Sequence, residues 1–384
     1  VNSNAANPVI GVRSYSDDPA RVGALGVQMM RGLLDEGVLC CAKHFPGHGD
    51  TDVDSHMGLP RVDKSLEELE RTELVSFRAA IDAGIPGIMS SHILFPQLEP
   101  DGLPATMSRR IMTGLLKERL GFKGLVVSDC MQMQAIQKFY GTVNGVVQAT
   151  KAGVDLVFVS HDAALAGQAA QALLEELQSG AFPREEMDAS VEKILAFKER
   201  YALDPLPLEE CGTEEQQRFV RRMLERSMTL VQSPETGLPA LGDAPLFVGC
   251  RAFRPTEASN SEDASFSFPE TMATRFGGHA LVTTPDPTEE EIRQALALAG
   301  ESSCLVVGSY NGHLKPGQKA LSKALAETGL PMIQVALRNP YDLQGLPAHV
   351  AALAAYEYTP QSLDVIAGVL CGEIQPTGKL PVRL

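Results

Sequence analysis

The sequence predicts an α/β protein in which amphipathic helices alternate with short apolar strands. The alternation is clearest between about residue 20 and residue 200, where four helical segments each lead into a strand. These strands are apolar on both faces, which is typical of parallel strands buried between layers of helices. A proline- and glutamate-rich segment, LDPLPLEECGTEEQQ, then separates this region from a second run of strands and helices.

Four consecutive helix–strand units carry this pattern in the first half of the chain. Each helix shows apolar residues at helical spacing, and each strand is a short apolar run. The helix and strand of each unit are predicted at 20–37 and 38–42, 65–84 and 85–90, 108–122 and 124–128, and 143–153 and 154–159. In the second half, further strands are predicted in APLFVGC, SCLVVGS, LPMIQVAL and VAALAAYEY.

Polar or titratable residues follow the carboxyl end of each of these four strands. They are Lys43 and His44, Ser91 and His92, Ser128 and Asp129, and residues 160–162. Ligands of α/β barrels and open α/β sheets bind at this edge. Capping of the next helix would explain the serines, but it explains His44 and His92 poorly. The pattern therefore predicts a binding or catalytic site at the carboxyl edge.

Composition excludes several classes of partner. The chain has 384 residues and a net charge of −15, which argues against nucleic acid and against an anionic membrane surface. No apolar run approaches the roughly 18 residues of a membrane span. Seven scattered cysteines without a CxxC motif indicate free, buried thiols rather than a disulfide or zinc framework. We therefore expect a cytoplasmic protein, and secretion or surface anchoring stays open.

The stretch KHFPGHGDTDVDSH, residues 43–56, gathers three histidines and three aspartates in a loop. It could bind a metal through His44, His48 and the aspartates, or its charged groups could simply satisfy one another. A third interpretation is acid–base chemistry. Asp54 and His56 are two residues apart, so an extended segment points both side chains to one side. A carboxylate beside an imidazole favours a proton donor that works near neutral pH.

Asp129 complements such a loop because it follows a buried strand and is rigidly held there. A carboxylate nucleophile with a separate acid/base group is the logic of retaining glycoside cleavage. The acid is a carboxyl group in most such enzymes, whereas here it would be His56.

The motif KHFPGHGDTDVDSHMGLP resembles the signature of glycoside hydrolase family 3, in its β-N-acetylhexosaminidase branch. NPVIGVRSYSDDP, PGIMSSHILFP, PATMSRRIMTGLLKERLGFKGLVVSDCMQM and KAGVDLVFVS are similar to that family in the same order. The ending GEIQPTGKLPVRL is similar to the end of two-domain members. The resemblance is strong over residues 1–160 and weaker beyond.

The resemblance implies a role for seven residues. Asp129 matches the catalytic nucleophile, His56 the general acid/base and Asp54 its partner. Arg13, Lys43 and His44 match residues that bind the sugar, and Met131 would lie near the same pocket. The family implies no metal and no cofactor, and we expect His48 to brace the loop.

The resemblance also implies a fold. A closed (β/α)8 barrel needs eight βα units, and we count four. We therefore expect residues 1–205 to form the second half of a TIM-type barrel, apparently truncated at its N-terminus. Residues 206–384 are expected to form a C-terminal α/β sandwich domain. A second chain could close the sheet, so homo-oligomerisation stays open.

Together these observations predict a retaining exo-β-N-acetylglucosaminidase acting on terminal N-acetyl-β-glucosaminides of muropeptides or chitin oligomers. The alternatives are a phosphorylase of the same glycosides, a β-glucosidase or β-xylosidase of the same family, and a metal-dependent hydrolase. A non-catalytic sugar-binding protein is a further alternative. The sequence does not choose between water and phosphate as acceptor.

Overall fold

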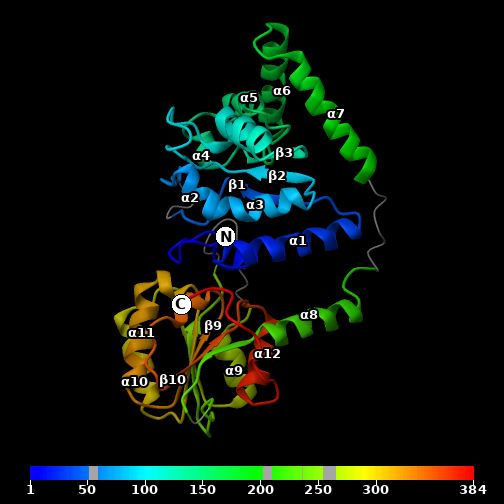
Figure 1. Cartoon of the computed structure of the whole chain (residues 1–384). Coiled ribbons are helices and arrows are strands. Elements are labelled where there is room, and N and C mark those ends of the chain that lie inside the picture. Colours follow the sequence, from blue (N-terminus) through cyan, green and yellow to red (C-terminus); the bar gives the residue numbers. More distant parts are fainter. Residues whose placement is uncertain (52–58, 202–209, 236, 254–264) are drawn as a thin grey trace. The chain divides into compact units, whose positions relative to one another are not determined.

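The computed structural model describes residues 1–51, 59–201, 210–235, 237–253 and 265–384. The chain divides into two compact units, Val1–Pro205 and Leu206–Leu384 (Figure 1). Each unit is built from strands that alternate with helices. The α/β class predicted from the sequence is therefore confirmed.

The first unit contains a parallel sheet with the strand order β1-β2-β3-β4. The strands are β1 (Cys41–Phe45), β2 (Gly87–Ser90), β3 (Leu125–Cys130) and β4 (Leu156–Phe158). Cys41 pairs with Gly87, Gly87 with Leu125, and Val127 with Leu156. Among the described residues, no further strand pairs with β1 or β4, so the sheet is open and not a closed barrel.

Eight longer helices and two short 3-10 turns belong to the described part of the first unit. They are η1 (Gly11–Arg13), α1 (Pro19–Asp35), α2 (Leu66–Arg71), α3 (Glu73–Asp82), η2 (Ala105–Met107), the π-helix η3 (Arg110–Arg119), α4 (Gln134–Gln137), α5 (Thr142–Ala152), α6 (Ala163–Gln178) and α7 (Arg184–Tyr201). α1 and α3 lie side by side because Gly23 permits a close approach: a Cβ there would come within 3.0 Å of the Ala79 Cβ. Buried aromatic and aliphatic side chains such as Phe45, Phe77 and Ile88 form the core.

Two details of the first unit differ from the sequence-based prediction. The helix predicted at 65–84 is broken at Thr72, whose backbone leaves the helical region with φ −125° and ψ −94°. β1 and β3 also run past their predicted ends, to Phe45 and Cys130, which pair with Ser90 and Phe158, whereas β2 and β4 stay within their predicted ranges. Lys43, His44 and Asp129 consequently lie within β1 and β3, where the register with the neighbouring strand is irregular.

The second unit contains a six-stranded sheet with the order β5-β10-β9-β8-β6-β7. Its strands are β5 (Thr229–Gln232), β6 (Leu246–Cys250), β7 (His279–Thr283), β8 (Leu305–Ser309), β9 (Met332–Ala336) and β10 (Val350–Ala354). β5 is antiparallel to β10, and the other neighbours are parallel. The sequence did not predict β7, whose residues are only partly apolar.

Alternate residues of this second sheet enter two separate cores. Phe247 packs with α9 and α12 on one face, whereas Leu246 and Val248 pack with α10 and α11 on the other. Figure 1 shows these helix pairs on opposite sides of the strands. The helices of this unit are α8 (Glu214–Ser227), α9 (Phe268–Phe276), α10 (Glu289–Ala299), α11 (Pro316–Ala326) and α12 (Pro360–Leu370), with the 3-10 turns η5 (Gly312–Leu314) and η6 (Pro340–Leu343).

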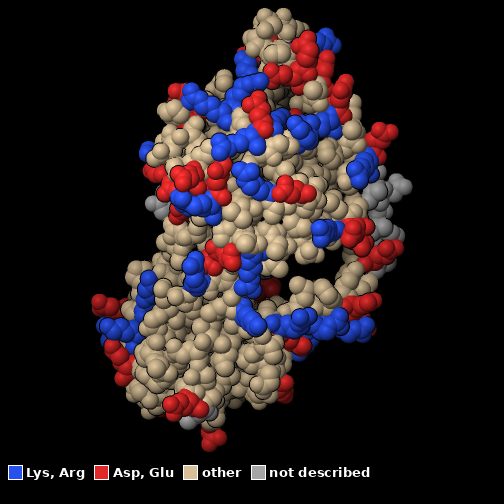
Figure 2. All heavy atoms as spheres, in the orientation of Figure 1, with Lys and Arg blue, Asp and Glu red and all other residues tan. Residues whose placement is uncertain are grey.

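The surface mixes acidic and basic side chains over the face that Figure 2 shows. No helix in the described ranges has the length and apolar content needed to cross a membrane. All seven cysteines are free, as the sequence predicts. The expectation that they are buried holds only for Cys250 and Cys304, because Cys40 and Cys130 are half-buried and the other three are exposed.

Asp155 connects several elements of the first unit although its side chain is only 1% exposed. Its carboxylate accepts hydrogen bonds from Lys117 at 3.3 Å, Lys193 at 3.0 Å, Ser190 at 2.8 Å and the Val126 amide at 2.8 Å. These donors come from η3, α7 and β3. Removing either the buried carboxylate or its partners leaves the other side of the ion pair uncompensated in the interior.

We predict that Asp155→Ala lowers the free energy of unfolding of the first unit by about 3–5 kcal/mol. Urea unfolding of the full chain, followed by probes in each unit, measures this loss. Asp188→Ala is the matched control, because Asp188 pairs with Arg184 at 3.4 Å on the surface. The control should change stability by at most about 0.5 kcal/mol. Equal effects of the two substitutions would contradict the proposed role of Asp155.

Candidate active site

His44 lies near the carboxyl end of β1, and the packing of the next residue, Phe45, fixes its position. Phe45 is fully buried and meets Phe77 edge to face, with 5.2 Å between ring centroids. The Phe45 carbonyl also accepts a hydrogen bond from Ser91 Oγ at 2.9 Å, which connects the ends of β1 and β2. His44 itself is 7% exposed. Its position is therefore set by the core and by the neighbouring strand.

Asp129 lies two strands away, near the end of β3, and its side chain reaches His44. The distance from His44 Nε2 to Asp129 Oδ2 is 3.4 Å, and the Cys130 amide donates to Asp129 Oδ1 at 2.8 Å. The Asp129 side chain is 28% exposed, so one side of the carboxylate is open. A carboxylate whose oxygens are held by hydrogen-bond donors and whose open side can receive a ligand can act as a nucleophile.

The surroundings keep Asp129 ionised. Burial raises the pKa of its carboxyl, but the hydrogen bond from His44, the neighbouring imidazoles and the Cys130 amide lower this pKa more strongly. The net pKa of Asp129 lies well below its ordinary value. Burial lowers the pKa of His44, so we describe the pair as a hydrogen bond from a neutral imidazole to an anion.

Lys43 lies near the Asp129 carboxylate, and Arg13 lies near Lys43 and His44. The charges of Arg13 and Asp129 both act on the pKa of Lys43, which burial and Arg13 lower and Asp129 raises. Arg13 and Lys43 also act on the pKa of His44. The structure thus brings together four of the residues predicted for the site: Arg13, Lys43, His44 and Asp129.

The loop that follows β1 is braced from two sides before its described part ends. Asn7 Nδ2 donates to the His48 carbonyl at 2.8 Å, and His48 Nδ1 lies 2.9 Å from Thr51 Oγ1. Lys64 Nζ contacts Asp50 at 2.9 Å and buried Glu73 at 2.6 Å. The sequence analysis missed Asn7, Lys64 and Glu73. No sequence pattern indicates these contacts, because the partners are far apart along the chain.

Two predicted site residues, Asp54 and His56, lie outside the described residues. Met131 is described and is fully buried in the core of the first unit, next to Gly145 on α5. Its backbone amide donates to the Phe158 carbonyl at 2.8 Å. The structure therefore places Met131 beneath the site, and it does not bring this side chain to an open surface.

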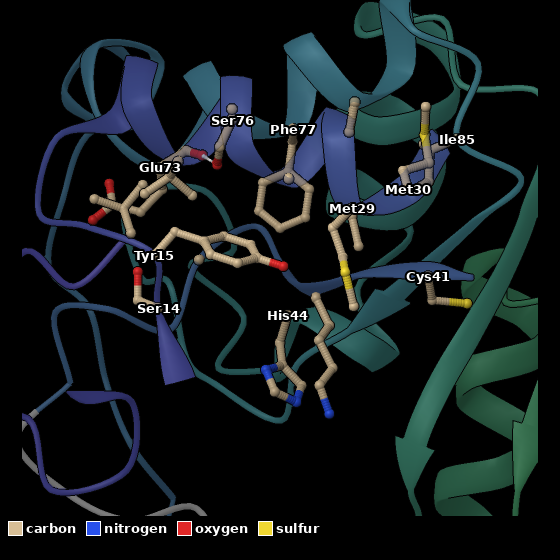
Figure 3. Close-up of a pocket in the computed structure, with 18 of the residues that line it drawn as sticks. Ser14, Tyr15, Met29, Met30, Cys41, His44, Glu73, Ser76, Phe77 and Ile85 are labelled. Carbon is tan, nitrogen blue, oxygen red and sulfur yellow. Dashed lines mark hydrogen bonds between the residues drawn. The ribbon is translucent and has the colours of Figure 1, made fainter. Parts of the chain in front are cut away.

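A cavity of about 280 Å³ lies beside β1 and α1, lined largely by apolar side chains. Figure 3 shows Tyr15, Met29 and Phe77 around this space, with His44 at its border. Asp129 does not line the cavity. His44 therefore lines the cavity and also contacts the Asp129 carboxylate, which lies outside it.

Of the residues considered as metal ligands, His44 and His48 lie close to each other. The His44 and His48 rings meet edge to face, with 5.5 Å between centroids. Across the described ranges, no group of three His, Cys, Asp or Glu side chains is arranged to hold a metal ion.

Comparison with known proteins identifies the family. Residues 1–197 match the model of the glycosyl hydrolase family 3 N-terminal domain. A family 3 β-N-acetylglucosaminidase from Paenibacillus sp. str. FPU-7 has a similar structure, with a TM-score of 0.90 and 40% identity. That similarity covers 100% of this chain and 74% of the other.

Curated relatives lead to the same family. Beta-hexosaminidase A of Pseudoalteromonas piscicida is 29% identical over 433 residues, which cover 100% of this chain and 72% of that protein. A beta-hexosaminidase of Thiobacillus denitrificans is 37% identical over 163 residues, or 42% of this chain and 45% of that protein. This chain belongs to glycoside hydrolase family 3, and the resemblance seen in the sequence is confirmed. It is thus a glycoside hydrolase by family.

We predict that His44→Leu raises the pKa of Asp129, because the substitution removes a hydrogen-bond donor and keeps the burial. His44→Gln, which retains an N–H donor, should raise it less. Carboxyl ¹³C NMR titration of the full chain, assigned with Asp129→Asn, measures this pKa. A pKa near the free value of about 3.9 in the unmutated chain would contradict the account.

The same pKa has a consequence for stability. Since the folded-state pKa of Asp129 is lowered, its ionisation stabilises the fold at pH values above the unfolded-state pKa. This contribution is lost as the pH falls toward the folded-state pKa. The His44→Leu chain should therefore lose less unfolding free energy than the unmutated chain as the pH is lowered from about 5 toward the folded-state pKa.

Proposed function

We propose that this chain is a retaining exo-β-N-acetylglucosaminidase and that Asp129 is its nucleophile. The observation that carries the proposal is the ionised Asp129 carboxylate, which lies at the carboxyl edge of a parallel sheet beside His44 and Lys43, with Arg13 near these two residues. Family membership and the names of the relatives support the N-acetyl-β-glucosaminide substrate. Muropeptides and chitin oligomers are the natural substrates that we infer.

The first chemical step forms a covalent intermediate. Asp129 attacks the anomeric carbon, and the bond between this carbon and the leaving oxygen breaks. His56 donates the proton that the leaving oxygen requires, with Asp54 orienting the imidazole. Lys43, His44 and Arg13 hold the hydroxyl groups of the sugar. Because Asp129 is already an anion at neutral pH, no proton has to leave it before attack.

The second step releases the sugar with its original configuration. His56, now neutral, takes a proton from water, and the water oxygen attacks the anomeric carbon from the face that the leaving group vacated. Asp129 leaves as a carboxylate, so two displacements at one carbon retain the β configuration. His56 suits both steps because an imidazole changes protonation state near neutral pH.

We further infer that the four βα units of the first unit correspond to four of the eight in a (β/α)8 barrel. The parallel order β1-β2-β3-β4, in which consecutive strands are neighbours, supports this inference, since a (β/α)8 barrel is built from strands in this order. Residues 1–205 would then form the catalytic domain and residues 206–384 a C-terminal α/β sandwich domain. The division into two compact units supports these boundaries.

We predict that the full chain releases nitrophenol from p-nitrophenyl N-acetyl-β-glucosaminide and that Asp129→Ala lowers kcat by at least about 10⁴-fold. The variant should keep the circular dichroism spectrum of the unmutated chain and lose only the stability that the ionised Asp129 carboxylate contributes. Turnover by the variant at the original rate would contradict the nucleophile assignment. A rate that requires added phosphate would instead support a phosphorylase.

We predict a different signature for His56→Ala. Loss of the proton donor should reduce kcat/KM by about 10²–10⁴-fold for substrates with poor, basic leaving groups. Activated p-nitrophenyl or dinitrophenyl glycosides need little protonation, so their first step should slow far less. A series of aryl N-acetyl-β-glucosaminides measures this dependence on leaving-group pKa. Equal losses across the series would show that His56 has a structural role.

A further inference from the structure

His92 lies between the two strands that carry His44 and Asp129, and the mechanism above does not use it. It is the second residue after β2 and is 2% exposed. Its Nδ1 is 3.0 Å from Thr106 Oγ1, and its Nε2 is 3.0 Å from the carbonyl oxygen of Cys130. Cys130 is the residue after Asp129, so His92 contacts the backbone immediately beside the proposed nucleophile.

The sheet itself does not hold this part of β3 on the side of β2. The last pair between these two strands is Met89 with Val127, two residues before Asp129. On the other side, Cys130 pairs with Phe158 after an irregularity in the register. The end of β3 would therefore be held from one side only. The contact from His92 to the Cys130 carbonyl replaces the missing ladder bond on the β2 side.

The direction of that hydrogen bond is fixed by chemistry. A carbonyl oxygen only accepts, so His92 Nε2 must carry a hydrogen. Thr106 anchors the other ring nitrogen and is itself fully buried, with Ser90 Oγ at 2.8 Å and the Ser91 carbonyl at 2.9 Å. Thr106 and the Cys130 carbonyl thus set the orientation of the ring before any substrate arrives.

We propose that His92 is a positioning residue for the nucleophile: its Nε2–H fixes the Cys130 carbonyl and thereby the direction of the Asp129 side chain. The inference rests on the proposed function of Asp129. Cys130 is also the residue whose amide donates to Asp129 Oδ1 at 2.8 Å. A rotation of the peptides around Cys130 would turn this donor away and move the carboxylate relative to His44. His92 resists that rotation without touching the substrate.

Two substitutions separate the hydrogen bond from simple packing. His92→Gln can place an N–H near the original Nε2 and reach the Cys130 carbonyl, whereas His92→Asn is too short and reaches only toward Thr106. We expect kcat to fall about 10–100-fold in His92→Asn, with KM within about two-fold, because a misplaced reacting group costs rate rather than binding. His92→Gln should recover most of kcat.

The controls distinguish failure of this inference from failure of the proposed function. His349→Asn removes a similar contact in the second unit, where His349 Nε2 lies 3.1 Å from the Ala326 carbonyl, and it should leave kcat unchanged. Activity retained in Asp129→Ala would overturn the proposed function. If Asp129→Ala is inactive but His92→Asn matches the unmutated chain, the inference about His92 is wrong. Equal losses in the Gln and Asn variants would also overturn it.

A second measurement needs no turnover. In ¹⁵N-histidine NMR of the full chain, assigned with His92→Gln, the His92 signal should show a hydrogen on Nε2. The Asp129 carboxyl pKa, followed by ¹³C NMR, should change in His92→Asn and return toward the original value in His92→Gln. A His92 ring protonated on Nδ1 alone would overturn the proposal, since it could not donate to the Cys130 carbonyl.

Discussion

Parallel pairing of β1, β2 and β3 brings their carboxyl ends to one edge, and every contact of the candidate site depends on that arrangement. His44 and Asp129 are 85 positions apart in the chain, yet the pairing through β2 leaves 3.4 Å between their side chains. Ser91 extends the connection by bonding the Phe45 carbonyl. If β2 shifted by one residue, side chains that now face the core would face the opposite side of the sheet.

The same edge determines the electrostatics. Asp129 is an anion close to the cationic Lys43 and to the His44 donor, and Arg13 lies near both of these side chains. Burial alone would favour a neutral carboxyl group, so the fold provides donors that outweigh the desolvation. The proposed mechanism uses this arrangement, because a carboxylate nucleophile must be charged and neighbouring cations could hold sugar hydroxyl groups.

The sequence predicted the α/β class, the polar strand ends and the Asp129 and His44 positions from local patterns alone. Apolar runs and their polar ends are short-range signals, and the structure has strands at these positions. Long-range features could not be predicted this way. The break at Thr72, the contact of Lys64 with Asp50 and Glu73, and the burial of Met131 all depend on residues that meet only after folding. His92 was visible at a strand end, but its Cys130 partner was not.

Covalent trapping tests the central claim most directly. A 5-fluoro-N-acetyl-β-glucosaminyl fluoride forms the glycosyl-enzyme readily but slows its breakdown, so peptide mass mapping of the full chain identifies the attacking residue. The account predicts one added N-acetylfluoroglucosaminyl group, carried by the peptide that contains Asp129. Attachment to any other carboxylate, or an unlabelled chain that releases the α-anomer as its first product, would contradict it.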